Sequence, residues 1–209
     1  VLANVNLAVR SGLCCIEDLL GKTAAEVFSS EIGMAFTQQD QLVMCGQPLS
    51  QHLELHLYQS GLLGWCMATK IPLKNAQGKV LGMAGMAVDL QEDRLNRPNI
   101  NSKLSKVEQY ISEKFDTPIQ ITELANIAGL SVSQLNRQFQ NIFHLTPSQL
   151  IQKKRLDYAI ELLSQDISVT EVSVRCGYAD HSAFGRKFKE LTSVSPRQFK
   201  QQLLSFKRV

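Results

Sequence analysis

The chain has 209 residues, 44% of them hydrophobic and 20% charged, with a formal net charge of +3. That length suffices for one large domain or two small ones with a buried core. No apolar run is long enough to cross a bilayer, and the first ten residues lack the layout of a signal peptide, so we expect a cytoplasmic protein. Because the numbering opens on Val1 and not on Met, we expect a piece of a longer protein.

Charge and cysteine usage narrow the functional classes further. Residues 1–98 hold 7 Lys+Arg against 9 Asp+Glu, whereas residues 99–209 hold 15 against 10, so a polyanionic partner is expected for the second region. A solvated surface gives a similar balance and is the alternative. The five cysteines contain no CxxC pair and indicate neither a disulfide framework nor a zinc knuckle.

The first region is expected to contain helices followed by strands. Residues 17–28 and 30–46 have helical patterns. Strand-like runs follow at residues 62–73 and 79–90, joined by NAQG, whose Asn and Gly suit a tight hairpin.

A further strand is expected over residues 52–58, where apolar and polar side chains alternate. Its polar members include His52, Glu54 and His56, which resemble metal ligands. Alternate residues of a strand lie about 6.6 Å apart, so the outer two would be some 13 Å apart and could not share one ion. We therefore predict that this face meets solvent and that the chain holds no metal.

One face of the predicted hairpin offers room for a ligand. Trp65 and Met67 share that face, Met86 is expected across from them, and Gly82 and Ala84 leave space for a small apolar molecule. Trp65, Met67 and Met86 are therefore the candidate ligand pocket. A filled core is the alternative.

The polar segment QEDRLNRPNINSK, residues 91–103, is predicted to be a linker. It divides the chain into domains at residues 1–90 and 103–209, with residues 91–102 between them. The second domain is predicted to be entirely helical. Thr146 and Pro147 are the expected N-cap and first residue of its longest helix.

One helical unit is repeated within the second domain. ITELANIAGL, residues 121–130, aligns with VTEVSVRCGY, residues 169–178, and the next segments align with one extra residue. Each copy has a short helix, a Gly suited to a left-handed conformation, an N-cap at Ser131 or Asp180, and a second helix. The sequence thus predicts two helix-turn-helix motifs joined by a long helix.

The second helix of each copy has an apolar side and a polar side without carboxylates. Arg137 and Arg186 occupy the same position in the two copies. Such a polar face suits the major groove, where Arg bonds guanine and Asn bonds adenine. A solvated amphipathic helix is the alternative, which the repetition disfavours. The connecting helix, about 25 Å long at ~1.5 Å per residue, allows both motifs to reach successive major grooves about 34 Å apart.

These motifs resemble the AraC/XylS family of bacterial transcription regulators over about Ser102 to Leu204. The most specific part is VTEVSVRCGYADHSAFGRKFKELTSVSPRQFKQQL, residues 169–203. The chain departs from the family pattern at Ser173, Ser193 and Phe199-Lys200, and Gly185 removes a side chain from the second reading face. The resemblance implies double-stranded promoter DNA and RNA polymerase as partners. It implies base contacts from Ser133, Gln134, Asn136, Arg137, His181, Ser182 and Arg186. The phosphate-contact candidates are Lys153, Lys154, Lys187, Lys189 and Arg197.

The first region is similar to PAS-type sensor domains. The resemblance implies an α+β domain, an antiparallel sheet with flanking helices. In it VLANVNLAV would be the second strand, and the first would precede Val1. A sheet edge left unpaired in this way invites pairing with another subunit, so a homodimer through this domain is expected. The candidate pocket named above would hold its small-molecule ligand. No flavin or haem motif is present, so no cofactor is expected.

Two other classes of function compete with a DNA-binding regulator. An enzyme would use Cys176 with Asp180 and His181, but the first copy has Ala128 where Cys176 stands, which favours an inward-packed thiol. A partner-binding module would use the basic helices to hold protein and would read no DNA.

Overall fold

The computed structural model describes residues 2–28, 30–57, 63–90, 102–165 and 167–206. The chain divides into two compact units. The first comprises Val1–Leu90 with Phe188–Phe199 and Ser205–Val209, and the second comprises Gln91–Lys187 with Lys200–Leu204. This division cuts α9 and α10, which are each one continuous helix. The expected linker falls almost wholly on residues 91–101, outside the described residues, so the domain limits 1–90, 91–102 and 103–209 stay a prediction.

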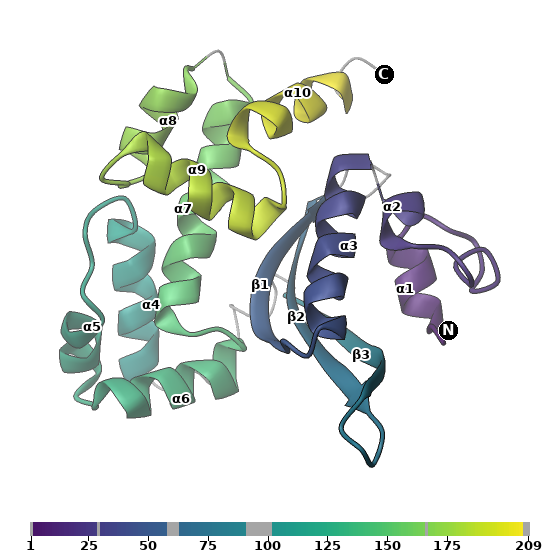
Figure 1. Ribbon diagram of the computed structural model, residues 1–209. Coiled ribbons are helices and arrows are strands. Elements are labelled where there is room, and N and C mark those ends of the chain that lie inside the picture. Colours follow the sequence, from purple (N-terminus) through teal and green to yellow (C-terminus); the bar gives the residue numbers. More distant parts are fainter. Residues whose placement is uncertain (1, 29, 58–62, 91–101, 166, 207–209) are drawn as a thin grey trace. The chain divides into compact units, whose positions relative to one another are not determined.

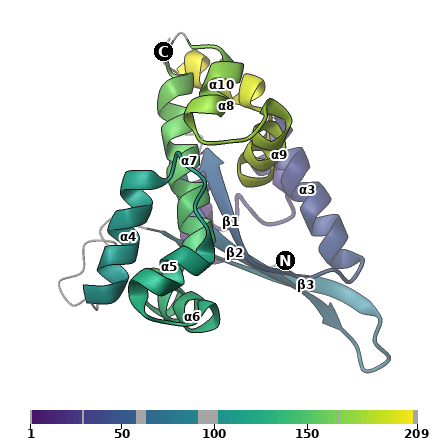
Figure 2. The same ribbon diagram turned by 90° about the vertical axis from the view of Figure 1, so that its left-hand side faces the viewer.

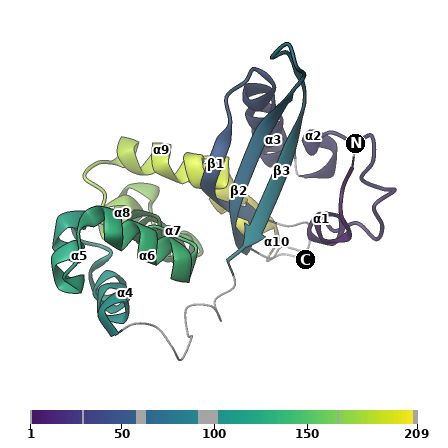
Figure 3. The ribbon, with the colours of Figure 1, turned by 90° about the horizontal axis from the view of Figure 1, so that it is seen from below.

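The N-terminal unit is a three-stranded antiparallel sheet with helices. Its strands lie side by side in the order β1-β2-β3, and α3 covers one face of the sheet (Figures 1 and 3). This agrees with the expected α+β class. The elements are α1 (Val5–Arg10), α2 (Ala24–Val27), α3 (Ser30–Met44), β1 (Leu49–Leu57), β2 (Leu63–Lys74) and β3 (Val80–Asp89).

The expected hairpin is confirmed. β2 and β3 pair antiparallel, and the Asn75 N–H donates to the Lys79 carbonyl at 3.0 Å to close the turn. Gly78 takes the left-handed conformation there, with φ +80°. The Asn75 side chain also accepts a hydrogen bond from the Lys79 N–H, so Asn and Gly both act as the turn requires.

Two N-terminal expectations are wrong. The segment VLANVNLAV is not a strand, because the Asn4 side chain accepts a hydrogen bond from the Leu7 N–H and starts α1. The helix expected over residues 17–28 is confined to α2. Gly21 adopts φ +81° before it, and Thr23 with Glu26 forms a capping box that starts the helix late.

The C-terminal region is all helical, as expected. In Figures 1 and 2, α4, α5 and α6 gather towards one end of α7 and α8 lies at the other. Thr146 caps α7, with Pro147 at its first position. The helices are α4 (Ser102–Lys114), α5 (Ile121–Ala128), α6 (Val132–Phe143), α7 (Pro147–Leu163), α8 (Val169–Arg175), α9 (His181–Thr192) and α10 (Pro196–Phe206).

Candidate nucleic-acid interface

The first helix-turn-helix motif is α5, a turn and α6. Gly129 ends α5 in the left-handed conformation, with φ 63°. Ser131 caps α6, and its hydroxyl accepts a hydrogen bond from the Gln134 N–H at 3.2 Å. The sequence prediction of the left-handed Gly and of the N-cap is confirmed here.

The second motif, α8, a turn and α9, repeats this local geometry. Gly177 follows α8 with φ 72°. Asp180 Oδ1 accepts a hydrogen bond from the Ala183 N–H at 2.7 Å and so caps α9. The same two local devices therefore orient the second helix of each motif.

The second helices each bury one side and expose the other. In α6 Leu135 and Phe139 are fully buried, and in α9 Phe184 and Phe188 are fully buried. Arg137 and Arg186, at the matched position on the opposite side, are exposed. A buried arginine in either motif would have excluded base reading, and neither arginine is buried.

The other predicted base-reading residues differ in how available they are. Ser133, His181 and Ser182 are exposed, and Asn136 is half-buried. Gln134 is exposed, but its side-chain oxygen already accepts the Ser131 N–H at 2.9 Å, so the carboxamide is partly committed to the cap. Their contacts with bases stay a prediction.

Lys153 does not suit its predicted phosphate contact. Its side chain is 6% exposed, and its Nζ lies 2.7 Å from Asp157 on the next turn of α7. A phosphate contact needs an accessible ammonium group, and that of Lys153 is buried in an ion pair. Lys189 and Arg197 are exposed, and Lys154 and Lys187 are half-buried, so these four stay candidates.

Arg155 of α7 joins the segment between α4 and α5 to the turn of the second motif, a role that the sequence does not reveal. Its guanidinium donates to the carbonyls of Phe115 at 2.6 Å and Thr117 at 2.8 Å, and lies 5.3 Å from the ring centroid of Tyr178. A planar group that donates two hydrogen bonds while stacking is characteristic of Arg and not of Lys. Tyr178, directly after Gly177, is the only visible sign of this contact in the sequence. No short-range sequence pattern indicates that its partner lies on α7.

Cys176 is unsuited to nucleophilic catalysis. The side chain is fully buried, and burial raises the pKa of its thiol to about 12, with the nearby Arg155 acting in the opposite direction. The thiol is therefore protonated at neutral pH, and the thiolate is the nucleophilic form. Asp180, the acid of the rival enzyme reading, caps α9.

The polar face of β1 was predicted to meet solvent, and this prediction is wrong: Glu54 is buried, and His52 and His56 are half-buried. Glu54 is 4% exposed. Its Oε1 accepts a hydrogen bond from Gln39 Nε2 of α3 at 2.6 Å, and its Oε2 lies 3.0 Å from His56 Nε2. Burial alone would raise the pKa of Glu54, but the hydrogen bonds from His56 and Gln39, with the charges of His56 and Lys70, bring that pKa below its usual value. Glu54 is thus a buried carboxylate.

The three residues of the candidate ligand pocket have different surroundings. The strand register pairs Met86 with Thr69, on the same face as Trp65 and Met67. Trp65 and Met67 are buried, at 8% and 7%, whereas Met86 is 63% exposed. Binding of a ligand there stays a prediction.

Within the described part of the chain, every helix is too short or too polar to cross a membrane.

The fold shows two helix-turn-helix motifs, α5–α6 and α8–α9, and comparisons with known proteins agree with it. Residues 124–202 match the family model described as a helix-turn-helix domain, and residues 3–95 match the one described as a PAS fold. The chain therefore matches a helix-turn-helix domain in its C-terminal part and a PAS fold in its N-terminal part, in agreement with the sequence resemblance.

Curated relatives match about half of the chain. The chain is 30% identical over 94 residues to the probable transcriptional regulator LumQ of Photobacterium leiognathi, and 31% identical over 104 residues to the transcriptional activator RhaS of Enterobacter sp. (strain 638). These matches cover 44% and 49% of this chain, but only 38% and 37% of the relatives. The C-terminal domain of AraT, a response regulator from Geobacillus stearothermophilus, is 25% identical with a TM-score of 0.47, over 50% of this chain and 88% of that one.

Proposed function

We propose that this protein is a sequence-specific transcription regulator whose α6 and α9 each read bases in the major groove of promoter DNA. The observation that carries the proposal is the repetition of one exposed arginine, Arg137 and Arg186, at the same position of two equally capped helices. Arg can donate two parallel hydrogen bonds to the edge of guanine, which gives discrimination between bases.

The relatives support the same function. LumQ is described as a probable transcriptional regulator and RhaS as a helix-turn-helix-type transcriptional activator. Since the two motifs recur within one chain, the site for one subunit is expected to be asymmetric, with its two halves about one helical turn apart, roughly 34 Å.

The proposed role of the PAS fold is to receive the signal. It would pair subunits into a homodimer or accept a small molecule, and so bias how the two motifs engage a promoter and RNA polymerase. Its exposed apolar side chains support a surface for such a contact: Ile71, Leu73 and Met86 are 49%, 47% and 63% exposed. The register places them on one face of the β2–β3 hairpin.

Selection from a random DNA pool with the full chain tests the proposal. The selected site would then be used to measure the affinities of Arg137→Ala and Arg186→Ala against the original chain. We expect each change to weaken the selected site by about 1–3 kcal/mol and to leave non-specific DNA nearly unaffected.

Arg175→Ala is the matched control. Arg175 is an exposed arginine of the same domain, but it lies on α8 and pairs with Glu171 one turn away. Its loss should change neither affinity by more than the exposed ion pair is worth, under about 1 kcal/mol. A pool that yields no preferred sequence would favour a partner-binding module. Equal losses on both DNAs would overturn the assignment of base reading to these two arginines.

A further inference from the structure

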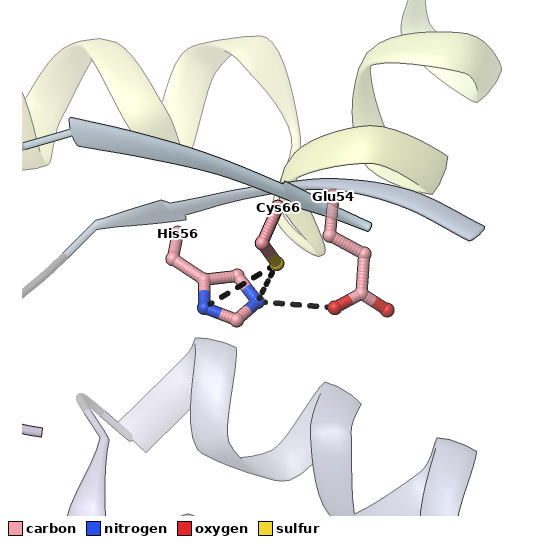
Figure 4. Close-up of side chains that lie close together, drawn as sticks. All are labelled: Glu54, His56 and Cys66. Atoms are coloured by element: carbon pink, nitrogen blue, oxygen red, sulfur yellow. Dashed lines mark hydrogen bonds and ion pairs between the residues drawn. The ribbon is translucent and has the colours of Figure 1, made fainter. Parts of the chain in front are cut away.

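A cluster of three metal-ligating side chains, two of them buried and His56 half-buried, lies in the N-terminal unit between the sheet and α3. Glu54 and His56 come from β1, and Cys66 comes from β2. Figure 4 shows the three side chains projecting to the same side of the sheet. Their ligand atoms all lie within 4.8 Å of one another.

The strand register brings the three residues together. Glu54 and His56 are alternate residues and therefore face the same side of the sheet. Cys66 is the cross-strand partner of Glu54. Directly opposed residues have Cβ atoms about 5 Å apart, so the backbone alone holds three donors close together.

His56 Nε2 lies close to both of the other candidate ligand atoms. His56 Nε2 lies 3.0 Å from Glu54 Oε2 and 3.4 Å from Cys66 Sγ. Zinc bonds of about 2.3 Å to sulfur and 2.0–2.2 Å to nitrogen or oxygen, in tetrahedral geometry, put neighbouring ligand atoms about 3.4–3.6 Å apart. The two separations from His56 Nε2 need only a slight expansion to reach those values.

The surroundings of the cluster also suit an ion. Glu54 and Cys66 are buried, and the rings of Phe36 and Phe28 lie 5.0 and 6.3 Å from the His56 ring. Gln39 Nε2 donates to the second oxygen of Glu54 at 2.6 Å and orients the carboxylate, as outer partners of metal ligands do.

A buried polar atom beside the cluster lacks a partner. Among the described residues, the side-chain oxygen of Gln39 is buried and accepts no hydrogen bond. An orphaned buried acceptor is costly, so native proteins rarely leave one. A water molecule on the fourth position of a bound ion would donate to it.

We propose that Glu54, His56 and Cys66 bind one thiophilic divalent cation, Zn²⁺, with water in the fourth position. Because a thiolate is a soft ligand, the site selects Zn²⁺ or Co²⁺ over Mg²⁺ and Ca²⁺. Binding displaces the thiol proton and any proton on His56 Nε2, which pass to the buffer. The proposal is independent of DNA reading, since no residue of either motif takes part.

Titration of the chelator-stripped full chain, without a polyhistidine tag, with Co²⁺ tests the proposal. We expect one ion per chain, a thiolate-to-cobalt charge-transfer absorption, and displacement of Co²⁺ by Zn²⁺ but not by Mg²⁺. Cys66→Ser should abolish the charge-transfer absorption. Glu54→Gln and His56→Asn should keep the thiolate yet weaken binding by at least about tenfold.

Two matched controls separate this site from adventitious binding. His52→Asn alters the histidine at the other end of the same strand face, and Cys45→Ser removes an exposed thiol. Both should bind Co²⁺ as the original chain does. The proposal is overturned if the chain binds no ion, or if the absorption survives Cys66→Ser.

Thermal unfolding provides a second readout. Zn²⁺ should raise the Tm of the original chain, since an ion that binds only the folded state stabilises it. Glu54→Gln preserves side-chain size, so its fold can be verified by circular dichroism. If Zn²⁺ raises its Tm as much as that of the original chain, Glu54 is not a ligand and the proposed site is wrong.

Discussion

At the scale of single residues, Gly177 is constrained twice, by its backbone and by its neighbour. Its φ of +72° lies in the left-handed region. A Cβ at this position would also lie 2.1 Å from the Asp116 carbonyl oxygen. Its counterpart Gly129 has φ +63° but would meet only the end of the Lys103 side chain, at 3.8 Å.

Gly177→Ala should therefore destabilise the protein more than Gly129→Ala does. The left-handed conformation costs a residue with a Cβ roughly 1–2 kcal/mol, and both variants incur that loss. Overpacking against the Asp116 backbone adds about 1–3 kcal/mol to Gly177→Ala alone. Urea unfolding followed by helical circular dichroism measures both free energies, and equal losses would mean that the Asp116 segment yields without cost.

Local chemistry was predictable at this scale, and non-local contacts were not. The two left-handed glycines and the caps Ser131, Asp180 and Thr146 follow from rules that act over a few residues. The approach of Asp116 to Gly177 depends on tertiary packing. Lys153 was misassigned because sequence patterns count Lys as polar, while its aliphatic stem packs inside and its ammonium group pairs within α7.

At the scale of elements, β1 shows what periodicity tells and what it leaves open. The alternation over residues 52–58 predicted a strand, and β1 is one. Alternation distinguishes the two faces but not what covers each. Helix α3 covers the polar face, so Glu54 is buried, and the candidate metal cluster includes a cysteine from the next strand that the spacing argument never considered.

Gly185 tests the cost of a glycine inside α9. A Cβ there would meet nothing within 4 Å, and the residue lies mid-helix with no left-handed requirement. Gly185→Ala should therefore raise the free energy of unfolding by about 1 kcal/mol, since Ala is the better helix former. Thermal or urea unfolding of the full chain measures the gain.

Gly33→Ala in α3 is the opposing control. Gly33 is also inside a helix, but its Cβ would lie 2.6 Å from the Ala24 carbonyl oxygen. The same substitution should destabilise the chain there, despite the same gain in helix propensity. If Gly185→Ala instead lowers the free energy of unfolding, the added methyl group must clash with an atom that is not within 4 Å of it in this structure.

At the scale of the whole molecule, the sequence indicates two regions of different character and a duplicated helical motif in the second. The charge balance changes between the two regions, and the repeated motif aligns with a nearly constant offset. Family models match residues 3–95 and 124–202, one in each region, and the domain limits between them stay a prediction. The spacing between recognition helices on DNA is a property of the complex, which is why it stays a prediction.

Electrostatic binding to DNA belongs to this scale too, because each protein–phosphate contact releases counterions. Every contact adds about 0.9 to the slope of log affinity against log salt concentration. Removing an exposed contact, as in Lys189→Ala, should lower the magnitude of that slope by about 1 and weaken all DNA sequences alike. Affinities measured across a salt series, for the selected site and for random DNA, give both quantities.

Lys153→Met is the matched control, because it removes the same charge from a buried lysine whose ammonium group pairs with Asp157. It should leave the salt slope unchanged while preserving the apolar stem. A reduced slope in Lys153→Met would show that α7 reorganises on DNA and frees this ammonium group to contact phosphate. If Lys189→Ala leaves the slope unchanged, Lys189 contacts no phosphate. The side of α9 opposite Phe184 and Phe188 would then not be the one that faces DNA.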